Sequence, residues 1–245
     1  MIDKRSDLSR YLVHLTRNYK NESALDNLIS ILKTKTIQAR NYHCLFSPKL
    51  RKMGISDVLK NSFKTVCFTE TPLNQIKNLV QDIPGRSINL QPYGIVFWRD
   101  QLLEKGANSA IYLNAQGTDL RNYLIQQFDD QFRNVKTLRK LKKEDSYYNE
   151  IVQYFSLINV INDKYDFSLE REWRYHGDFK FNYRNMVAIV CENPEKFEGI
   201  CEKKLGTKVL NFVKRTPLIS PEWNYEQVIE ELSIKLWDMK PKSER

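Results

Sequence analysis

The sequence predicts an α+β fold, and three observations lead to that prediction. Segments with the two-residue alternation of strands and segments with helical periodicity are mixed along the chain without a strict order. The chain has 245 residues, of which 41% are hydrophobic and 28% are charged, so it can bury a substantial core in a single domain over residues 1–245. Only 8 glycines are present, without a glycine-rich phosphate loop, which argues against nucleotide-binding folds built on such a loop.

The first half of the chain is expected to contain four strands, with helices and one long loop between them. Ser23 has the side chain of an N-cap before an amphipathic helix, Pro72 opens a second helix, and Gly106 ends a third, short one. Polar residues, a proline and a glycine predict a long surface loop over 41–54. The four strands are predicted at 11–16, 64–70, 93–98 and 110–114.

The second half is predicted to begin with a helical insertion at about 116–160. The C-terminal helix, at about 220–240, is predicted to start with Ser220 as its N-cap and Pro221 at its first helical position. The other expected elements are helices near 119–138, 147–157 and 194–205 and strands at 167–177, 185–192 and 208–213.

The charge of the chain favours polyanionic partners. The net charge is +9 and the pI is about 9.2, so the field around the protein attracts nucleic acid or an acidic protein. One basic cluster between two predicted helices is the candidate contact with nucleic acid, and a solvated basic turn is the alternative interpretation. Its members are Lys136, Arg139, Lys140, Lys142 and Lys143.

The sequence gives no indication of a membrane or metal site. The N-terminus lacks an apolar run followed by a small-residue cleavage site, and apolar stretches such as 93–98 are too short to span a bilayer. The four cysteines have no CxxC spacing, so they are expected to be plain thiols without zinc or disulfides. We therefore expect a cytoplasmic protein without bound metal and without a membrane partner.

The charged stretch 167-FSLEREWRYHG-177 contains the strongest candidate for chemistry. On a strand, Glu170, Glu172 and Arg174 point to one face because side chains alternate with a period of two. Two neighbouring carboxylates repel each other unless a cation offsets them or a site requires them. One interpretation is a solvent-exposed face paired through Arg174. The other is a catalytic pair, in which one carboxylate stabilises a cationic transition state and the other assists a nucleophile.

Several motifs resemble known families. The segments 64-KTVCFTETPL-73, 93-YGIVFWRDQLLEKGANSAIYLN-114 and 170-EREWRY-175 resemble the AbiGi family of abortive-infection proteins of bacterial anti-phage systems. The opening His-x-Thr strand, a central strand with a hydroxyl residue and the late Glu-x-Glu strand resemble the ADP-ribosyltransferase fold of DarT-type and related toxins. This resemblance implies a split β-sheet core with surrounding helices and NAD as the co-substrate.

The transferase resemblance also implies residue roles. Glu172 would bind a ribose hydroxyl and stabilise the oxocarbenium-like cation that forms as nicotinamide leaves, and Glu170 would orient or deprotonate the nucleophile. His14 would contact the nicotinamide ribose and carboxamide with Thr16 nearby, and Phe68 or Tyr93 would stack on the nicotinamide ring. Thr69 would take the central-strand hydroxyl position, and Arg40 or Arg51 would hold the pyrophosphate. The same strand and cap residues also have plain structural interpretations.

Three functional hypotheses follow. The first is an NAD-dependent ADP-ribosyltransferase toxin that modifies nucleic acid, as messenger RNA or single-stranded DNA, with a cognate antitoxin protein as partner. The second is a non-catalytic AbiGi-type antitoxin that neutralises a separate toxin. The third is a nucleic-acid-binding regulator, whose binding would depend on salt and be indifferent to NAD.

Overall fold

The computed structural model shows an α+β fold, as the sequence predicts. The chain forms two compact units, whereas the sequence analysis expects one domain. Unit 1 comprises Met1–Thr36, Phe68–Lys105 and Lys180–Arg245, and unit 2 comprises Ile37–Cys67 and Gly106–Phe179. The structure describes residues 9–52, 57–84, 86, 88–114, 119–132, 146–161 and 170–239.

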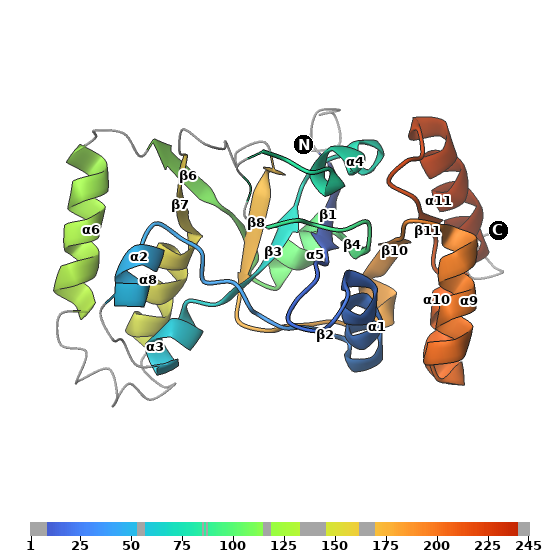
Figure 1. Cartoon of the computed structure of the whole chain (residues 1–245), viewed down its shortest axis with the longest axis horizontal. Helices are drawn as coiled ribbons and strands as arrows, with labels where there is room; N and C mark the ends of the chain where they lie inside the picture. Colours follow the sequence, from blue (N-terminus) through green and yellow to red (C-terminus); the bar gives the residue numbers. More distant parts are fainter. Residues whose placement is uncertain are drawn as a thin grey trace. The chain divides into compact units, whose positions relative to one another are not determined.

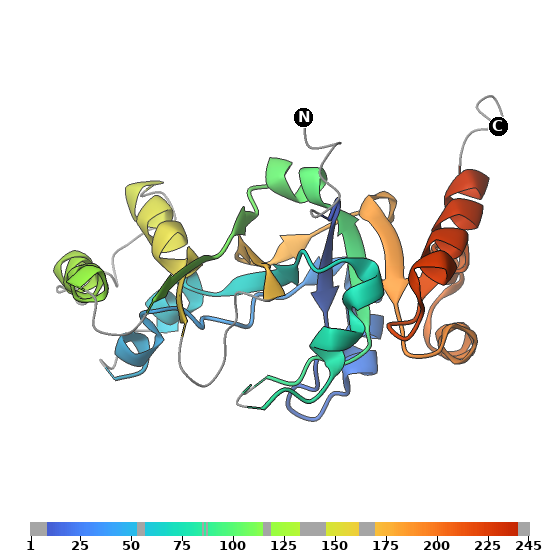
Figure 2. The same cartoon turned by 90° about the horizontal axis from the view of Figure 1, so that it is seen from above.

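Unit 1 contains most strands of the main sheet together with helices from both ends of the chain (Figure 1). Helices α9, α10 and α11 gather at the β11 end of its strands, as Figure 2 also shows. The elements are β1 (Tyr11–Leu15), α1 (Ala24–Thr34), η2 (Leu73–Gln75), α4 (Lys77–Val80), β4 (Gly94–Trp98), α5 (Arg99–Glu104), η4 (Tyr183–Asn185), β10 (Met186–Val190), α9 (Pro194–Lys204), α10 (Thr207–Arg215), β11 (Leu218–Ile219) and α11 (Tyr225–Met239).

Unit 2 contains shorter strands and a helical layer. Three further strands have one part in each unit: β2 (Thr36–Ile37), β3 (Thr65–Thr69) and β9 (Phe179–Lys180). The elements that belong wholly to unit 2 are α2 (Ser47–Lys52), α3 (Asp57–Ser62), β5 (Asn108–Ser109), β6 (Ile111–Asn114), α6 (Asp119–Phe132), α8 (Ser146–Leu157), β7 (Ile158–Ile161) and β8 (Glu172–His176).

The main sheet follows the order β11-β10-β4-β1-β3-β8-β5 in the part of the chain that the structure describes. Strand β1 is antiparallel to both β3 and β4, whereas β10 and β11 run parallel. Gly94 pairs with Leu15, and a Cβ at this position would lie 2.3 Å from the carbonyl oxygen of His14. Only glycine therefore allows β1 and β4 to approach this closely. Two smaller sheets pair β2 with β9 and β6 with β7.

Each unit has its own hydrophobic cluster. In unit 1, apolar residues of β1, β4 and β10 pack with residues of η2, α4 and α11. In unit 2, Phe46, Phe63, Phe128, Phe132 and Phe155 form an aromatic cluster, in which Phe46 and Phe128 stack with ring centroids 4.7 Å apart. Such ring contacts stabilise a core beyond their buried area.

The predicted loop over 41–54 is wrong for its central part. Leu45, Phe46 and Leu50 are fully or almost fully buried in the unit 2 core, and residues 47–52 form helix α2. Ser47 fixes the turn before this helix, because its hydroxyl accepts a hydrogen bond from the Cys44 amide at 2.7 Å. Proline and polar residues marked the helix start here rather than a solvated loop.

The predicted strand over 208–213 is also wrong, because these residues belong to helix α10. Val209, Leu210 and Val213 lie at helical spacing, and Val213 is buried. A short run of apolar and β-branched residues cannot separate a strand from a helix by its pattern alone. Packing in the folded protein therefore determines that this segment is a helix.

The C-terminal helix begins later than predicted. Helix α11 starts at Tyr225, so Ser220 and Pro221 lie in the turn before it. The cap is Asn224, whose Oδ1 accepts from the Gln227 amide at 3.0 Å while Gln227 Oε1 accepts from the Asn224 amide at 3.0 Å. This reciprocal arrangement is a capping box.

Candidate functional site: a buried carboxylate network

The centre of the candidate site is an ion pair between Glu172 and Arg174 on β8 of unit 2. Arg174 donates from Nε to Glu172 Oε1 at 3.0 Å and from Nη2 to Oε2 at 2.8 Å. The side chain of Glu172 is 10% exposed and that of Arg174 only 2%. The pair is thus bidentate and nearly withdrawn from water, which fixes the orientation of the carboxylate.

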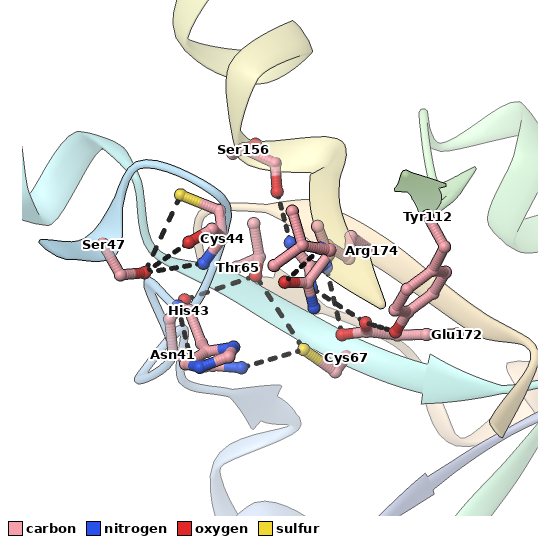
Figure 3. A network of polar contacts seen from close by, with 12 residues as sticks. Asn41, His43, Cys44, Ser47, Thr65, Cys67, Tyr112, Ser156, Glu172 and Arg174 are labelled. Carbon is pink, nitrogen blue, oxygen red and sulfur yellow. Dashed lines mark hydrogen bonds and ion pairs between the residues drawn. The ribbon is translucent and has the colours of Figure 1, made fainter. Parts of the chain in front are cut away.

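Two other elements of unit 2 make hydrogen bonds with the Glu172–Arg174 pair (Figure 3). Tyr112 of β6 donates its hydroxyl to Glu172 Oε2 at 2.5 Å, the length of a charge-assisted hydrogen bond. Arg174 donates from Nη1 to the carbonyl oxygen of Ser156 in α8 at 2.6 Å. Strand β5 holds β8 in place, because the Ala110 amide, just after β5, donates to the Glu172 carbonyl at 2.8 Å. Strand β6 therefore contacts the carboxylate, α8 contacts the arginine, and the segment after β5 holds the backbone that carries the pair.

The electrostatics keep Glu172 ionised. Burial by itself raises the pKa of this carboxyl, but the charge and hydrogen bonds of Arg174 outweigh it and lower the pKa below its usual value. Burial raises the pKa of Tyr112, and the charge of Glu172 raises it further, so the phenol remains a donor. Arg174 remains a cation, because Glu172 raises its pKa against the effect of burial.

The predicted shared face holds for Glu172 and Arg174 but not for Glu170. Strand β8 begins at Glu172, and Arg171 before it has φ 44°, in the left-handed region, so strand alternation does not extend back to Glu170. The expectation that all three side chains share one strand face is therefore wrong. The charge of Glu170 nevertheless contributes to the raised pKa of Tyr112, so Glu170 lies within electrostatic range of the network.

A thiol extends the network toward the segment after β2. Asn41 donates from Nδ2 to Cys67 Sγ at 3.4 Å, and Thr65 Oγ1 lies 3.9 Å from the same sulfur (Figure 3). Burial and the charge of Glu172 raise the pKa of Cys67 to about 12, and Cys67 in turn lowers the pKa of Glu172. Cys67 is therefore a neutral thiol rather than a nucleophile at neutral pH.

His43 lies at the exposed end of this network. Its amide donates to Asn41 Oδ1 at 2.8 Å. Partial burial of its ring and the nearby charge of Arg174 lower its pKa, so the imidazole is neutral at pH 7.

The residues that the resemblance assigns to the nicotinamide end of NAD lie in unit 1. Thr16 is buried and donates its hydroxyl to the carbonyl oxygens of Ala24 at 2.8 Å and Tyr93 at 3.0 Å. Phe68 is 3% exposed and meets His14 edge-on with ring centroids 5.9 Å apart. These contacts give Thr16 and Phe68 structural roles, and the buried ring of Phe68 leaves no open face for stacking on nicotinamide.

Tyr93 and Thr69 are likewise engaged within unit 1. The hydroxyl of Tyr93 donates to Glu192 Oε2 at 3.1 Å, and burial raises its pKa to about 12. Thr69 is buried at the end of β3, where its Oγ1 donates to Thr71 Oγ1 at 2.8 Å and accepts from the Thr71 amide at 3.1 Å. Thr69 therefore caps the turn after the strand.

The predicted pyrophosphate contacts lie in unit 2. Arg40 donates to Gln38 Oε1 from Nε at 3.3 Å and from Nη2 at 3.1 Å. Arg51 is an exposed residue of α2, and its charge is one of those that act on His43. Arg51 is thus in electrostatic contact with the network through His43. The basic cluster lies outside the described residues, namely Lys136, Arg139, Lys140, Lys142 and Lys143.

The structure also bears on metals and membranes. Over the residues that it describes, no group of three or more His, Cys, Asp or Glu side chains is arranged to hold a metal ion. Within the same ranges, no helix has the length and apolar character needed to cross a membrane.

Sequence reasoning missed Tyr112, Cys67, Asn41 and His43. Tyr112 sits in an ordinary strand pattern, and Asn41 and His43 fall in the segment predicted as a surface loop. The one available signal was the polar content of that segment, because long irregular segments often carry functional residues.

Comparisons with known proteins do not assign this chain to a family. No protein-family model, no characterised protein and no solved structure matches this sequence or fold. The resemblance to the AbiGi family and to ADP-ribosyltransferases therefore stays a prediction from the motifs.

Proposed function

We propose that this chain is an NAD-dependent ADP-ribosyltransferase that modifies nucleic acid, as the toxin of a bacterial anti-phage system. One observation carries the proposal: Glu172 is a buried carboxylate kept ionised and oriented by Arg174 and Tyr112. A fixed negative charge of this kind stabilises a glycosyl cation without reorganising when the charge develops.

The reaction proceeds at the anomeric carbon of the nicotinamide ribose. The bond from C1′ to the nicotinamide nitrogen breaks, and nicotinamide leaves as a neutral base with the bonding electron pair. Glu172 stabilises the resulting oxocarbenium-like cation. A lone pair of the acceptor then forms the new bond to C1′, and the acceptor proton passes to Glu170 or to water.

Glu172 retains one position for the ribose. A carboxylate offers about four lone-pair positions, and the three hydrogen bonds from Arg174 and Tyr112 occupy three of them. A ribose hydroxyl would donate to the fourth position while the Arg174 pair stays intact.

The test is incubation of the purified chain with labelled NAD and a mixed pool of RNA, DNA and protein. Wild-type protein should transfer label to nucleic acid, and Glu172→Gln should reduce transfer by at least about 100-fold, because the oriented charge is lost. Glu70→Gln is the matched control, since Glu70 is also 10% exposed and paired with a buried arginine, Arg99. A wild-type chain that neither binds NAD nor transfers label would refute the proposal.

One observation favours a second candidate, a non-catalytic AbiGi-type antitoxin that binds and neutralises a partner toxin. Glu172 is only 10% exposed and already has a nearly complete set of donors, which is what a structural ion pair requires. In that case Glu172→Gln protein that remains folded would still rescue cells co-expressing the partner toxin. NAD would be neither bound nor consumed.

A further inference from the structure

The described part of unit 1 carries a basic and aromatic surface made by α1, η4 and α10. We define this ring-and-cation surface by six residues: Lys35, Tyr183, Arg184, Lys208, Phe212 and Arg215. We propose that it binds single-stranded nucleic acid. The choice of partner rests on the proposed function, whose acceptor is nucleic acid, whereas the surface itself stands on contacts within unit 1.

The rings at its centre are fixed in a stack. Phe212 of α10 lies against Tyr183 of η4 with ring centroids 4.7 Å apart and an interplanar angle of 27°. Tyr183 is anchored, because its hydroxyl donates to the Leu32 carbonyl of α1 at 2.7 Å. Phe212 remains 37% exposed. A nucleobase can thus extend an existing stack without first ordering the rings.

Helix periodicity places two cations beside the exposed ring. Lys208 lies four residues before Phe212 and Arg215 three residues after it, so all three occupy one face of α10. All three residues are exposed, whereas Val213 faces the core. The helix therefore presents cation, ring and cation in a row.

The end of α1 adds a third cation. Lys35 ends the helix in the left-handed region with φ 53°, and its carbonyl accepts from the Phe181 amide at 3.1 Å. This places Lys35 next to η4, and its Nζ lies 5.7 Å from the Tyr183 ring centroid. Arg184 follows Tyr183 and is exposed. Cations around a ring stack match the alternation of phosphates and bases in a single strand.

The charge on this surface is not offset by carboxylates. In the described ranges, Lys35, Arg184, Lys208 and Arg215 form no ion pair. Neighbouring lysines differ, since Lys204 pairs with Asp26 at 2.5 Å and Lys214 pairs with Glu202 at 2.6 Å. The four unoffset cations make this surface positive within a protein of net charge +9. An acidic polypeptide would satisfy the cations but would leave the exposed ring without a stacking partner.

The experiment is fluorescence anisotropy with a labelled oligouridine of ~12 nucleotides, measured without NAD. Omitting NAD separates the outcomes, since a chain that binds RNA but does not cleave NAD overturns only the proposed function. Phe212→Ala should weaken binding by about 5- to 150-fold through the loss of one stacked base. The double variant Lys208→Gln/Arg215→Gln should lower the slope of log K against log salt by about 0.7 per lost phosphate contact.

Matched controls come from exposed residues of the same unit. Tyr225→Ala removes an aromatic side chain that is 63% exposed, and Lys77→Gln removes an exposed helix lysine; neither should change the affinity. If Phe212→Ala does not fold by circular dichroism, the double glutamine variant carries the test alone. Equal binding of duplex RNA, binding unchanged in the surface variants, or binding of polyglutamate in place of oligouridine would each overturn the proposal.

Discussion

Among the described residues, each unit buries a glutamate–arginine pair, and the two pairs are built differently. In unit 2, Arg174 uses two nitrogens on Glu172 and a third on the Ser156 carbonyl. In unit 1, Arg99 makes one short contact, from Nη1 to Glu70 Oε1 at 2.9 Å. In the described residues the buried Nε of Arg99 has no hydrogen-bond partner, and Asp100 Oδ1 is 3.8 Å away from it.

The difference separates an oriented carboxylate from one that is merely neutralised. Burying two charges costs more than their attraction returns unless the geometry is good and the remaining donors are bonded. The unit 2 pair meets that condition, and it holds Glu172 in one orientation. In the unit 1 pair, Arg99 contacts the carboxylate through one nitrogen and leaves its Nε without a hydrogen bond in the described residues. This contrast is why Glu172, and not Glu70, is the candidate for chemistry.

The largest expected effect that tests this contrast is on stability. Glu172→Gln leaves the Arg174 charge buried without a counter-ion and should lower the free energy of unfolding by about 3–5 kcal/mol. Glu70→Gln should cost less, about 1–3 kcal/mol, because Arg99 contacts Glu70 through one nitrogen rather than two. Hydrogen exchange read peptide by peptide during urea unfolding assigns each loss to its unit. Equal losses would remove the distinction between the two pairs.

A smaller effect is expected from Tyr112→Phe. This change removes the 2.5 Å hydrogen bond to Glu172 Oε2 but leaves the ion pair, so the loss should be about 1.5–3 kcal/mol, the range for a hydrogen bond to a charged group. Urea unfolding followed by tryptophan fluorescence provides the measurement. Tyr154→Phe, at an exposed position of the same unit, is the control and should unfold like the wild type. A Tyr112→Phe protein as stable as that control would show that the phenol does not hold the carboxylate.

The smallest expected effect is on the pH dependence of the free energy of unfolding. The folded-state pKa of Glu172 lies below its unfolded value of about 4.3. The ionised pair therefore stabilises the protein above that pH, and the contribution disappears as the pH falls through the folded pKa. Urea unfolding between pH ~3 and 7 should show a shallower acid loss for Glu172→Gln than for wild type. Parallel pH profiles would contradict the lowered pKa.

The sequence predicted a helix or strand correctly where its hydrophobic periodicity and its capping or terminating residues indicated the same element. Ser23 caps α1 as expected, with its hydroxyl accepting from the Asp26 amide at 3.1 Å. Gly106, with φ 97°, follows the end of α5, and the strands at 11–16, 64–70 and 93–98 all exist. The segment 208–213 failed because six residues are too few to distinguish the two periods. The strands β7 and β11 were not predicted at all, since their pairing partners are distant in the sequence.

The candidate site was predictable only in part. The spacing of Glu172 and Arg174 indicated a shared strand face, and the structure confirms it with two hydrogen bonds. The same periodicity misplaced Glu170, because the left-handed turn at Arg171 interrupts the alternation. Nothing in the local pattern around Tyr112 or Cys67 marked them as partners of Glu172.

By itself, the sequence determined the positive charge of this protein and the spacing that places Glu172 and Arg174 on one strand face, because these depend on residue identity and on neighbours two positions apart. The tertiary structure alone decided that Leu45, Phe46 and Leu50 pack into a core, that 208–213 is helical, and that Tyr112 and Ser156 contact the Glu172–Arg174 pair. The physical reason is that burial and hydrogen bonding between distant segments depend on which surfaces meet in the folded chain. The local periodicity of a sequence does not show which distant segments pack against each other.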